Sequence, residues 1–337
     1  MHLVFTPTRV SAARTQPEKT SGIPTAAKAM RIVQGQDVGQ PNQCSNSLHL
    51  FEQSDSWKDL AHRVVPSKLP PEHRMKAFLL CDDCHVDAVV SLCQSHGMGI
   101  EIQSFFDPEL PKENPQSILD HRQAISSIPL RSLHGPFADL CPGSFDIMVR
   151  NVARHRFDYA CDVARELGAS HVVLHHGYVP GTSAGHNWLS RSRVFWEDFL
   201  SSAPPDIHFH LENMLEHDPE LIVDLVDAVN SPVLDVCLDV GHAHCHGRVP
   251  VVKWIERLGQ RIGYVHLHDN DGESDEHLSL GLGTIPIREV CDALRSYAPN
   301  AIWALETSAP GLEQSIKCLE DNGFLGSAAK PDSYGRG

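Results

Sequence analysis

The sequence predicts an α/β fold in which eight parallel strands alternate with helices and close into a (β/α)8 TIM barrel. From Met75 onward, short β-rich runs alternate with longer amphipathic stretches, as expected for repeated βα units around a parallel sheet. Eight such runs occur, and eight strands close this barrel. Six of the runs end in a side chain suited to metal binding, which indicates a functional site at one end of the barrel.

The predicted strands are short apolar segments, and the stretches between them have helical spacing. The strands cover 75–80, 100–104, 130–134, 171–175, 207–212, 236–240, 262–268 and 302–307. Between the third and fourth strands, apolar residues recur roughly at helical spacing and Gly168 provides a stop; they are Ile147, Val149, Val152, Ala160, Val163 and Leu167. We expect such helices to form the outer ring.

The strand ends distinguish a closed barrel from a doubly wound open sheet, which has the same alternation of elements. Strands three to eight end in His134, His175, Glu212, Asp239, His266 and Glu306. In a closed barrel these ends converge on one mouth, whereas the outer strands of an open sheet lie too far apart. Their common chemistry therefore favours the barrel.

The chain is longer than a barrel requires. Its 337 residues accommodate a barrel of about 250 residues plus an extra segment. Residues 1–74 are rich in Pro, Ser, Gln and Thr and end in PSKLPPEH, which predicts a mostly disordered N-terminal extension. A targeting role is the alternative, but Glu18 and the scattered prolines make a poor amphipathic helix. The predicted barrel covers 75–325, and 326–337 form a tail.

Composition limits the partners and the cellular location. The formal charge of −15 provides no basic field for a phosphate backbone, so nucleic acid is a disfavoured partner. No run of about 20 apolar residues is present, which argues against a membrane span. Ten cysteines are scattered through the sequence, and we interpret them as reduced residues of a cytoplasmic protein. Cys81 and Cys84 have zinc-site spacing, but no second such pair completes a site.

Two glutamates at strand ends indicate a metal ion. Glu212 and Glu306 end apolar strands, where burial of an unpaired carboxylate would cost several kcal/mol. A bound cation would offset that cost. Asp239 and His242 add two potential ligands three residues apart, and Gly241 between them eases the turn.

The segment after the seventh strand supplies further donors. His266 and His268 share one strand face, and the following loop brings Asp269, Asp275 and His277 over the mouth. A single strand-end histidine is more often structural, and acidic loops are usually solvated, but agreement among six strands favours metal binding. We interpret three other histidines as structural, namely His176, His244 and His246, and assign no role to His186, His208, His210 and His217.

These motifs resemble the xylose isomerase-like TIM-barrel superfamily, which contains sugar isomerases and epimerases and the endonuclease IV-type AP endonucleases (AP endonuclease family 2). The most specific matches are LHGPFADL, VVLHHG, the ENM at Glu212, CLDVGHA, VHLHDNDGESDEHLSLGLGTI and the final LE. In the sugar enzymes, the resemblance implies one Mn, Mg, Co or Zn ion held by Glu212, Asp239, His266 and Glu306. Glu212 and Glu306 would also be the catalytic acid and base.

The endonuclease branch implies a three-zinc cluster with a larger ligand set. The additional matching positions are His134, His175, His242, Asp275 and His277. This sequence departs from that branch in ENMLEH, DVGHA and HLHDND, where the endonucleases usually carry a Thr with a Gly-rich turn, a Cys and a Ser-Lys pair. These departures and the acidic charge favour a small-molecule substrate.

The sequence-based hypothesis is a metal-dependent sugar or sugar-phosphate isomerase or epimerase that transfers a proton next to a carbonyl through an enediolate. His242 and His268 are predicted to bind substrate hydroxyls. The expected partner is a small-molecule carbohydrate, and a homo-oligomer remains open. The loops after strands two and four contain no clear Arg or Lys cluster, which favours a non-phosphorylated substrate. The alternatives are a zinc-dependent phosphodiester hydrolase, a dehydratase and a non-catalytic binding barrel.

Overall fold

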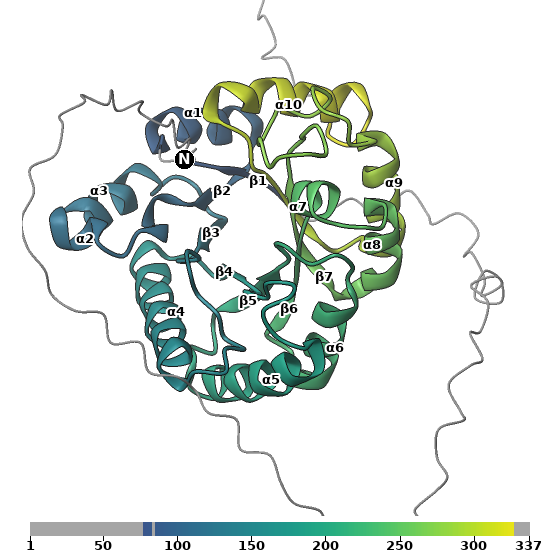
Figure 1. The fold of residues 1–337 in the computed structure, drawn as a ribbon. Helices are drawn as coiled ribbons and strands as arrows, with labels where there is room; N and C mark the ends of the chain where they lie inside the picture. Colours follow the sequence, from purple (N-terminus) through teal and green to yellow (C-terminus); the bar gives the residue numbers. More distant parts are fainter. Residues whose placement is uncertain (1–76, 83–84, 327–337) are drawn as a thin grey trace, which may run out of the picture. The chain divides into compact units, whose positions relative to one another are not determined.

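The computed structural model describes residues 77–82 and 85–326, in which eight parallel strands form a closed barrel. The strands follow one another in chain order, and β8 pairs with β1 to close the ring. Figure 1 looks into this ring and shows the helices around it. The predicted TIM barrel is therefore confirmed. The extension predicted over 1–74 and the tail from 327 lie outside the described residues, as does Cys84.

Each predicted strand overlaps one strand of the structure. The strands are β1 (Phe78–Cys81), β2 (Gly99–Ile102), β3 (Arg131–His134), β4 (His171–His175), β5 (His208–Glu212), β6 (Leu234–Asp239), β7 (Ile262–Leu267) and β8 (Ile302–Leu305). The fourth was predicted at its observed bounds and the last was predicted too long. The first was predicted to include Ala77, which precedes β1, and its residues 75–76 lie outside the described residues. These runs begin or end beyond the residues that pair with neighbouring strands.

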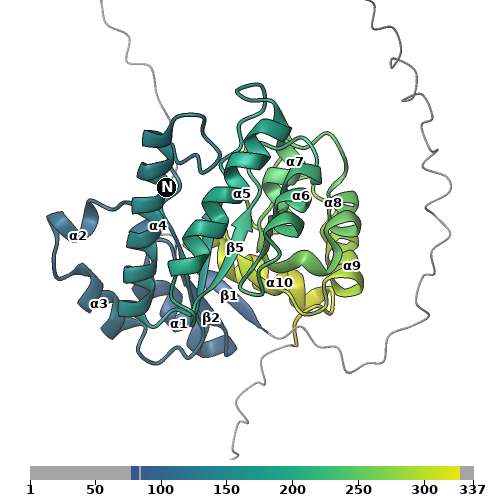
Figure 2. The ribbon, with the colours of Figure 1, turned by 90° about the horizontal axis from the view of Figure 1, so that it is seen from below.

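Except for the short helix at the mouth that carries His242, the helices form the outer layer of the barrel (Figure 2). The helices are α1 (Val86–His96), α2 (Leu110–Glu113), α3 (Ser117–Ala124), α4 (Ile147–Leu167), α5 (Gly185–Ser202), α6 (Glu220–Val229), α7 (Val240–Cys245), α8 (Val251–Leu258), α9 (Ile287–Tyr297) and α10 (Ala309–Asp321). Two short 3-10 turns are η2 (Ser104–Phe106) and η3 (Gly259–Arg261). Over the described residues, no helix combines the length and the apolar character that a membrane span requires.

Helix α4 follows the sequence pattern only in part. It ends at Gly168, whose left-handed φ of 67° suits a residue without a side chain. Three residues of the predicted inward face are instead exposed, namely Ile147, Val149 and Val152. The helix has 21 residues and is about 31 Å long, whereas a five-residue strand spans about 17 Å. Its first turns therefore extend beyond the strand against which the rest of the helix packs.

The core has two parts, and the site lies above the inner one. A small cluster fills the barrel interior with Leu79, Cys81, Val173, Cys237, Tyr264, Ile302 and Ala304. A larger cluster lies between the strands and the helices and includes the fully buried Trp188, Trp196, Trp254 and Trp303. Burial of this much apolar surface stabilises the barrel and allows its carboxyl end to carry a dense set of polar groups.

Candidate metal centre at the barrel mouth

The carboxyl ends of six consecutive strands bring the predicted donors together. His134, His175, Glu212 and Asp239 are the last residues of β3, β4, β5 and β6. His266 is the next-to-last residue of β7, and Glu306 directly follows β8. All six side chains are buried. The parallel register sets His175 beside Glu212 and Asp239 beside His266, so strand pairing itself assembles the site.

Glu212 is the centre of the first donor group. Its Oε2 atom lies 3.1 Å from Nε2 of His134 and 3.3 Å from Nε2 of His175. Its Oε1 atom faces the other way, 3.3 Å from Nδ1 of His266 and 3.4 Å from Nδ1 of His242. The two oxygens of one carboxylate therefore face two different sets of donors.

The second donor group contains Glu212, Asp239, His266 and Glu306. Nδ1 of His266 lies 3.1 Å from Oε2 of Glu306 and 3.7 Å from Oδ2 of Asp239. Asp239 also caps α7, because its Oδ1 accepts a 2.6 Å hydrogen bond from the backbone N–H of His242. Asn213 pairs with both backbone polar groups of Asp239, at 2.9 and 3.1 Å. The carboxylate is thus fixed at the junction of β6 and α7.

The third donor group comes from α7 and the loop after β7. Oδ2 of Asp275 lies 3.2 Å from Nε2 of His242 and 3.0 Å from Nε2 of His277. The other ring nitrogen of His277 donates to the backbone oxygen of Glu306 at 2.9 Å. Backbone pairing of Asp269 with Leu278 folds this loop back onto the strand end. The loop therefore holds Asp275 and His277 at the mouth.

The three donor groups fit divalent ions. Donors bound to one tetrahedral ion at about 2.0–2.1 Å lie about 3.3–3.4 Å apart, and the N···O distances in the first and third groups are 3.0–3.3 Å. Among the described residues, Nδ1 of His266, Oε2 of Glu306 and Oδ1 of Asp275 are buried without a hydrogen-bond partner. Buried polar atoms normally have a hydrogen-bond partner. Atoms that lack one are therefore suited to bind a cation.

Glu101 on β2 is a functional residue that the sequence analysis missed. Its Oε1 atom lies 3.0 Å from Nε2 of His266, and Tyr264 donates a 2.5 Å hydrogen bond to its Oε2. Burial alone would raise the pKa of Glu101, but the charge of His266 and its hydrogen bond lower it to about 2. Glu101 is therefore an ionised carboxylate that fixes the ring of a candidate ligand. A carboxylate between Ile100 and Ile102 in a predicted strand was the available signal.

Gln103 and His268 orient two further donors. Gln103 donates a 2.6 Å hydrogen bond to Oε1 of Glu306, and burial raises the pKa of Glu306. His268 is fully buried, and its Nε2 lies 3.1 Å from both oxygens of Asp239. Its ring stacks on His277 with centroids 4.1 Å apart. The structure therefore sets His268 against Asp239, and its predicted contact with substrate stays a prediction.

Two of the histidines interpreted as structural have protein partners. His176 is buried and donates to Glu216 at 2.6 Å, and His244 pairs with the hydroxyl of Thr284 at 2.9 Å. Each ring thus has one protein partner, although Nε2 of the buried His176 has no hydrogen-bond partner.

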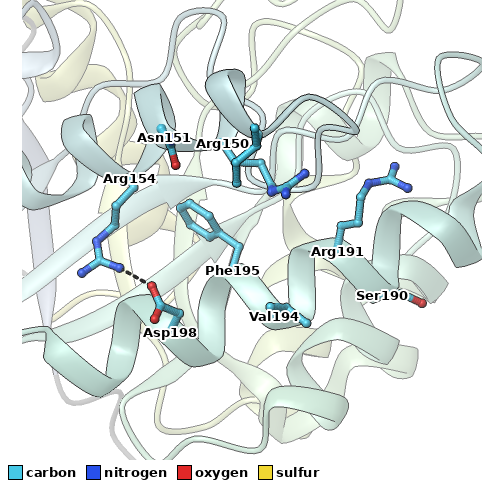
Figure 3. A pocket seen from close by; sticks show the side chains of 9 residues that line it. Arg150, Asn151, Arg154, Ser190, Arg191, Val194, Phe195 and Asp198 are labelled. Atoms are coloured by element: carbon cyan, nitrogen blue, oxygen red, sulfur yellow. Dashed lines mark hydrogen bonds and ion pairs between the residues drawn. The ribbon is translucent and has the colours of Figure 1, made fainter.

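A separate groove of about 400 Å³ lies on the outer surface between α4 and α5 (Figure 3). Arg154 and Asp198 form an ion pair of 2.7 Å across it. Its lining is Ile147, Arg150, Asn151, Arg154, Ser190, Arg191, Val194, Phe195 and Asp198. None of the mouth donors lines this groove, so it is distinct from the candidate metal centre.

The comparison with protein families agrees with this architecture. Residues 90–322 match the family described as the xylose isomerase-like TIM barrel. The chain belongs to this family. The match includes every donor of the three groups, from His134 to Glu306.

Individual proteins similar to this chain include a curated relative and two solved structures. A probable endonuclease 4 of Mycobacterium leprae is 29% identical over 201 residues, which cover 56% of this chain and 77% of that protein. A Thermus thermophilus protein whose crystals were soaked with ZnCl2 is 25% identical, with a TM-score of 0.60 over 76% of this chain and 100% of its own. A D-tagatose 3-epimerase-like protein is 24% identical, with a TM-score of 0.59 over 73% and 96% of the two chains. The last likeness concerns the fold alone.

Proposed function

We propose that this protein is a metal-dependent phosphodiester hydrolase whose active site is the barrel mouth. The observation that supports this most is the division of Glu212 between two donor groups, one at each carboxylate oxygen. A site for a single ion needs only about four donors, which the second group already supplies. The remaining donors are His134, His175, His242, Asp275 and His277. Their convergence favours a centre with several ions.

Several ions suit phosphoryl chemistry. Bound divalent ions would supply Lewis acidity, orienting a phosphoryl group and neutralising the charge that develops on its attacking and leaving oxygens. The protein's own contribution is to hold the donors rigidly. Glu101 fixes His266, Gln103 fixes Glu306, and His268 fixes Asp239. Such preorganisation means that the donors need little rearrangement during the reaction.

The proposed substrate is a small phosphodiester with a ring beside the phosphate. Phe137 is half-buried at the mouth, stacked on Phe106 with centroids 5.3 Å apart and on His175 at 4.8 Å. The half-buried Phe106 and Phe137 of this stack would supply apolar contacts to a sugar or base ring. The net charge of −15 opposes a long phosphate backbone, which proteins bind through many basic contacts. A small molecule avoids that requirement.

The second candidate is the sugar isomerase or epimerase favoured by sequence alone. Glu212 and Glu306 approach the same nitrogen, Nδ1 of His266, at 3.3 and 3.1 Å. Burial raises the pKa of Glu306. Burial also acts to raise the pKa of Glu212, but its histidine neighbours lower it. A carboxyl with a raised pKa and one with a lowered pKa are suited to give and to take a proton. We rank this candidate second because it leaves the first and third donor groups without a role.

A substrate panel separates the two candidates. Tag-free protein loaded with zinc, manganese or cobalt would be tested on bis(p-nitrophenyl) phosphate, on an abasic-site oligonucleotide and on a set of free ketoses. We expect p-nitrophenol release that Glu212→Gln abolishes, with little cleavage of the oligonucleotide. Interconversion of a ketose without release of p-nitrophenol would overturn the proposal in favour of the second candidate.

A further inference from the structure

A second group of histidine and aspartate side chains lies at the opposite, amino end of the barrel. His171 and His208 are the first residues of β4 and β5, and Asp235 is the second residue of β6. The strand register pairs His171 with His208 and His210 with Asp235. No mouth donor belongs to this group, which we call the base cluster: His171, His208, His210 and Asp235.

One carboxylate joins two histidines in the base cluster. Oδ2 of Asp235 lies 2.8 Å from Nε2 of His208, and its Oδ1 contacts Nδ1 of His210. One ligand atom from each of these three residues falls within 4.8 Å of the others. Zinc sites with three protein ligands can consist of two imidazole nitrogens and a carboxylate oxygen. A fourth position is then left to solvent.

His171 contacts the second ring nitrogen of His210. Its Nδ1 lies 2.9 Å from Nε2 of His210, the ring nitrogen that points away from Asp235. When Nδ1 of His210 binds an ion, its Nε2 carries the proton and can donate to His171. The second ring nitrogen of His210 therefore has the acceptor that a metal-bound imidazole needs.

The base cluster is anchored on one side and accessible to solvent on the other. At Gly263 on β7, a Cβ atom would lie 1.8 Å from Oδ2 of Asp235, so the absence of a side chain there makes room for the carboxylate. His210 is buried, whereas the side chains of His208 and Asp235 are 33% and 24% exposed. The donors are thus anchored on one side and open to solvent on the other.

We propose that the base cluster is a second metal site, in which His208, His210 and Asp235 bind one zinc-like divalent ion and His171 positions His210. The contacts of Asp235 with His208 and His210 are shorter than the separation of about 3.3 Å between donors of one tetrahedral ion. Binding therefore requires the side chains to move apart by about half an ångström at His208 and by more at His210. The rival description is a closed hydrogen-bond network that needs no ion.

Cobalt titration of the tag-free full chain tests the proposal. Co²⁺ absorption in the visible region and elemental analysis would be compared for the wild type, His208→Asn and Glu212→Gln, with His186→Asn at an exposed site as the matched control. We expect His208→Asn to lose one ion, or to bind it at least tenfold more weakly. Glu212→Gln should keep that ion while losing mouth ions, and the control should match the wild type.

Equal stoichiometry and equal spectra for the wild type and a folded His208→Asn variant would overturn the proposal. Circular dichroism establishes the fold of each variant, and the partly exposed position of His208 makes unfolding an unexpected outcome. The variant His171→Gln provides a second check. It should retain the ion but weaken its binding about 10–100-fold, as expected for a residue that orients a ligand.

Discussion

Glu101 on β2 and His266 on β7 are in direct contact across the barrel, with Oε1 of Glu101 3.0 Å from Nε2 of His266. The contact leaves Nδ1 of His266 facing Glu212 and Glu306. Glu101 therefore determines which nitrogen of His266 is offered to an ion.

Replacing Glu101 by Gln removes this ionic anchor while keeping the shape of the side chain. We expect metal affinity at the mouth to fall about 10–100-fold, because partners that orient metal ligands typically contribute that much. Competition with a fluorescent chelator measures the change. The exposed Glu313→Gln is the control, and unaltered affinity in Glu101→Gln would show that Glu101 has no orienting role.

Tyr264→Phe tests the hydrogen bond that Glu101 accepts from Tyr264. The Tyr264 hydroxyl contacts both Glu101 and Ser132, at 2.5 and 2.8 Å. Its removal leaves buried polar atoms unsatisfied, so the free energy of unfolding should fall by about 1–3 kcal/mol. Urea denaturation of the metal-free protein measures this. Tyr297→Phe, at an exposed hydroxyl-bearing residue, should change stability by less than about 0.5 kcal/mol; equal effects would contradict the assignment.

Gly241→Ala tests the packing behind Asp239. A Cβ atom at Gly241 would lie 1.9 Å from Cε1 of His268, so His268 must move away from Asp239. We expect weaker metal binding together with a stability loss of about 1–3 kcal/mol. Gly97→Ala serves as the comparison, since its left-handed φ of 65° strains any side chain but no atom lies within 4 Å. The free energy of unfolding of Gly97→Ala should fall by about 1 kcal/mol, and its metal affinity should stay unchanged.

Metal affinity should increase with pH between about 7 and 9. Burial alone would lower the pKa of His277, but Asp275 and Glu306 raise it to about 9 in the metal-free protein. His277 is therefore protonated at pH 7, and an ion must displace that proton to bind. Above pH 9 the competition from the His277 proton ends. Calorimetry in buffers of different ionisation enthalpy should detect proton release at pH 7, and a binding enthalpy independent of the buffer would contradict this account.

The sequence predicted the barrel well because its signals are repeated. Eight apolar runs and a donor at each of six strand ends gave independent indications of one arrangement. Glu101 was missed because it lies inside β2 and reaches the site only through the contact across the barrel. The base cluster was missed for a similar reason. His208 and His210 share one strand face, but only the register of β5 and β6 brings Asp235 beside them.

The sequence alone favoured the sugar isomerase or epimerase over the hydrolase, because it could not show how the donors divide into groups. The donors shared by both branches are visible as residues, but the orientation of each carboxylate oxygen is not. In the structure, Oε2 of Glu212 faces His134 and His175 while Oε1 faces His266. This division changes the preferred hypothesis from a one-ion isomerase to a hydrolase with several ions.

The most direct test of the central claim is elemental analysis of the tag-free protein with paired single-site variants at the mouth. His134→Gln and His277→Gln each remove a donor from a different outer group. The ion proposed for the base cluster is counted separately, as the difference in metal content between the wild type and His208→Asn. We predict three ions at the wild-type mouth and the loss of one ion in each mouth variant, with hydrolysis abolished in both. One mouth ion in the wild type, unaffected by either variant, would contradict the account and support a single-ion sugar isomerase.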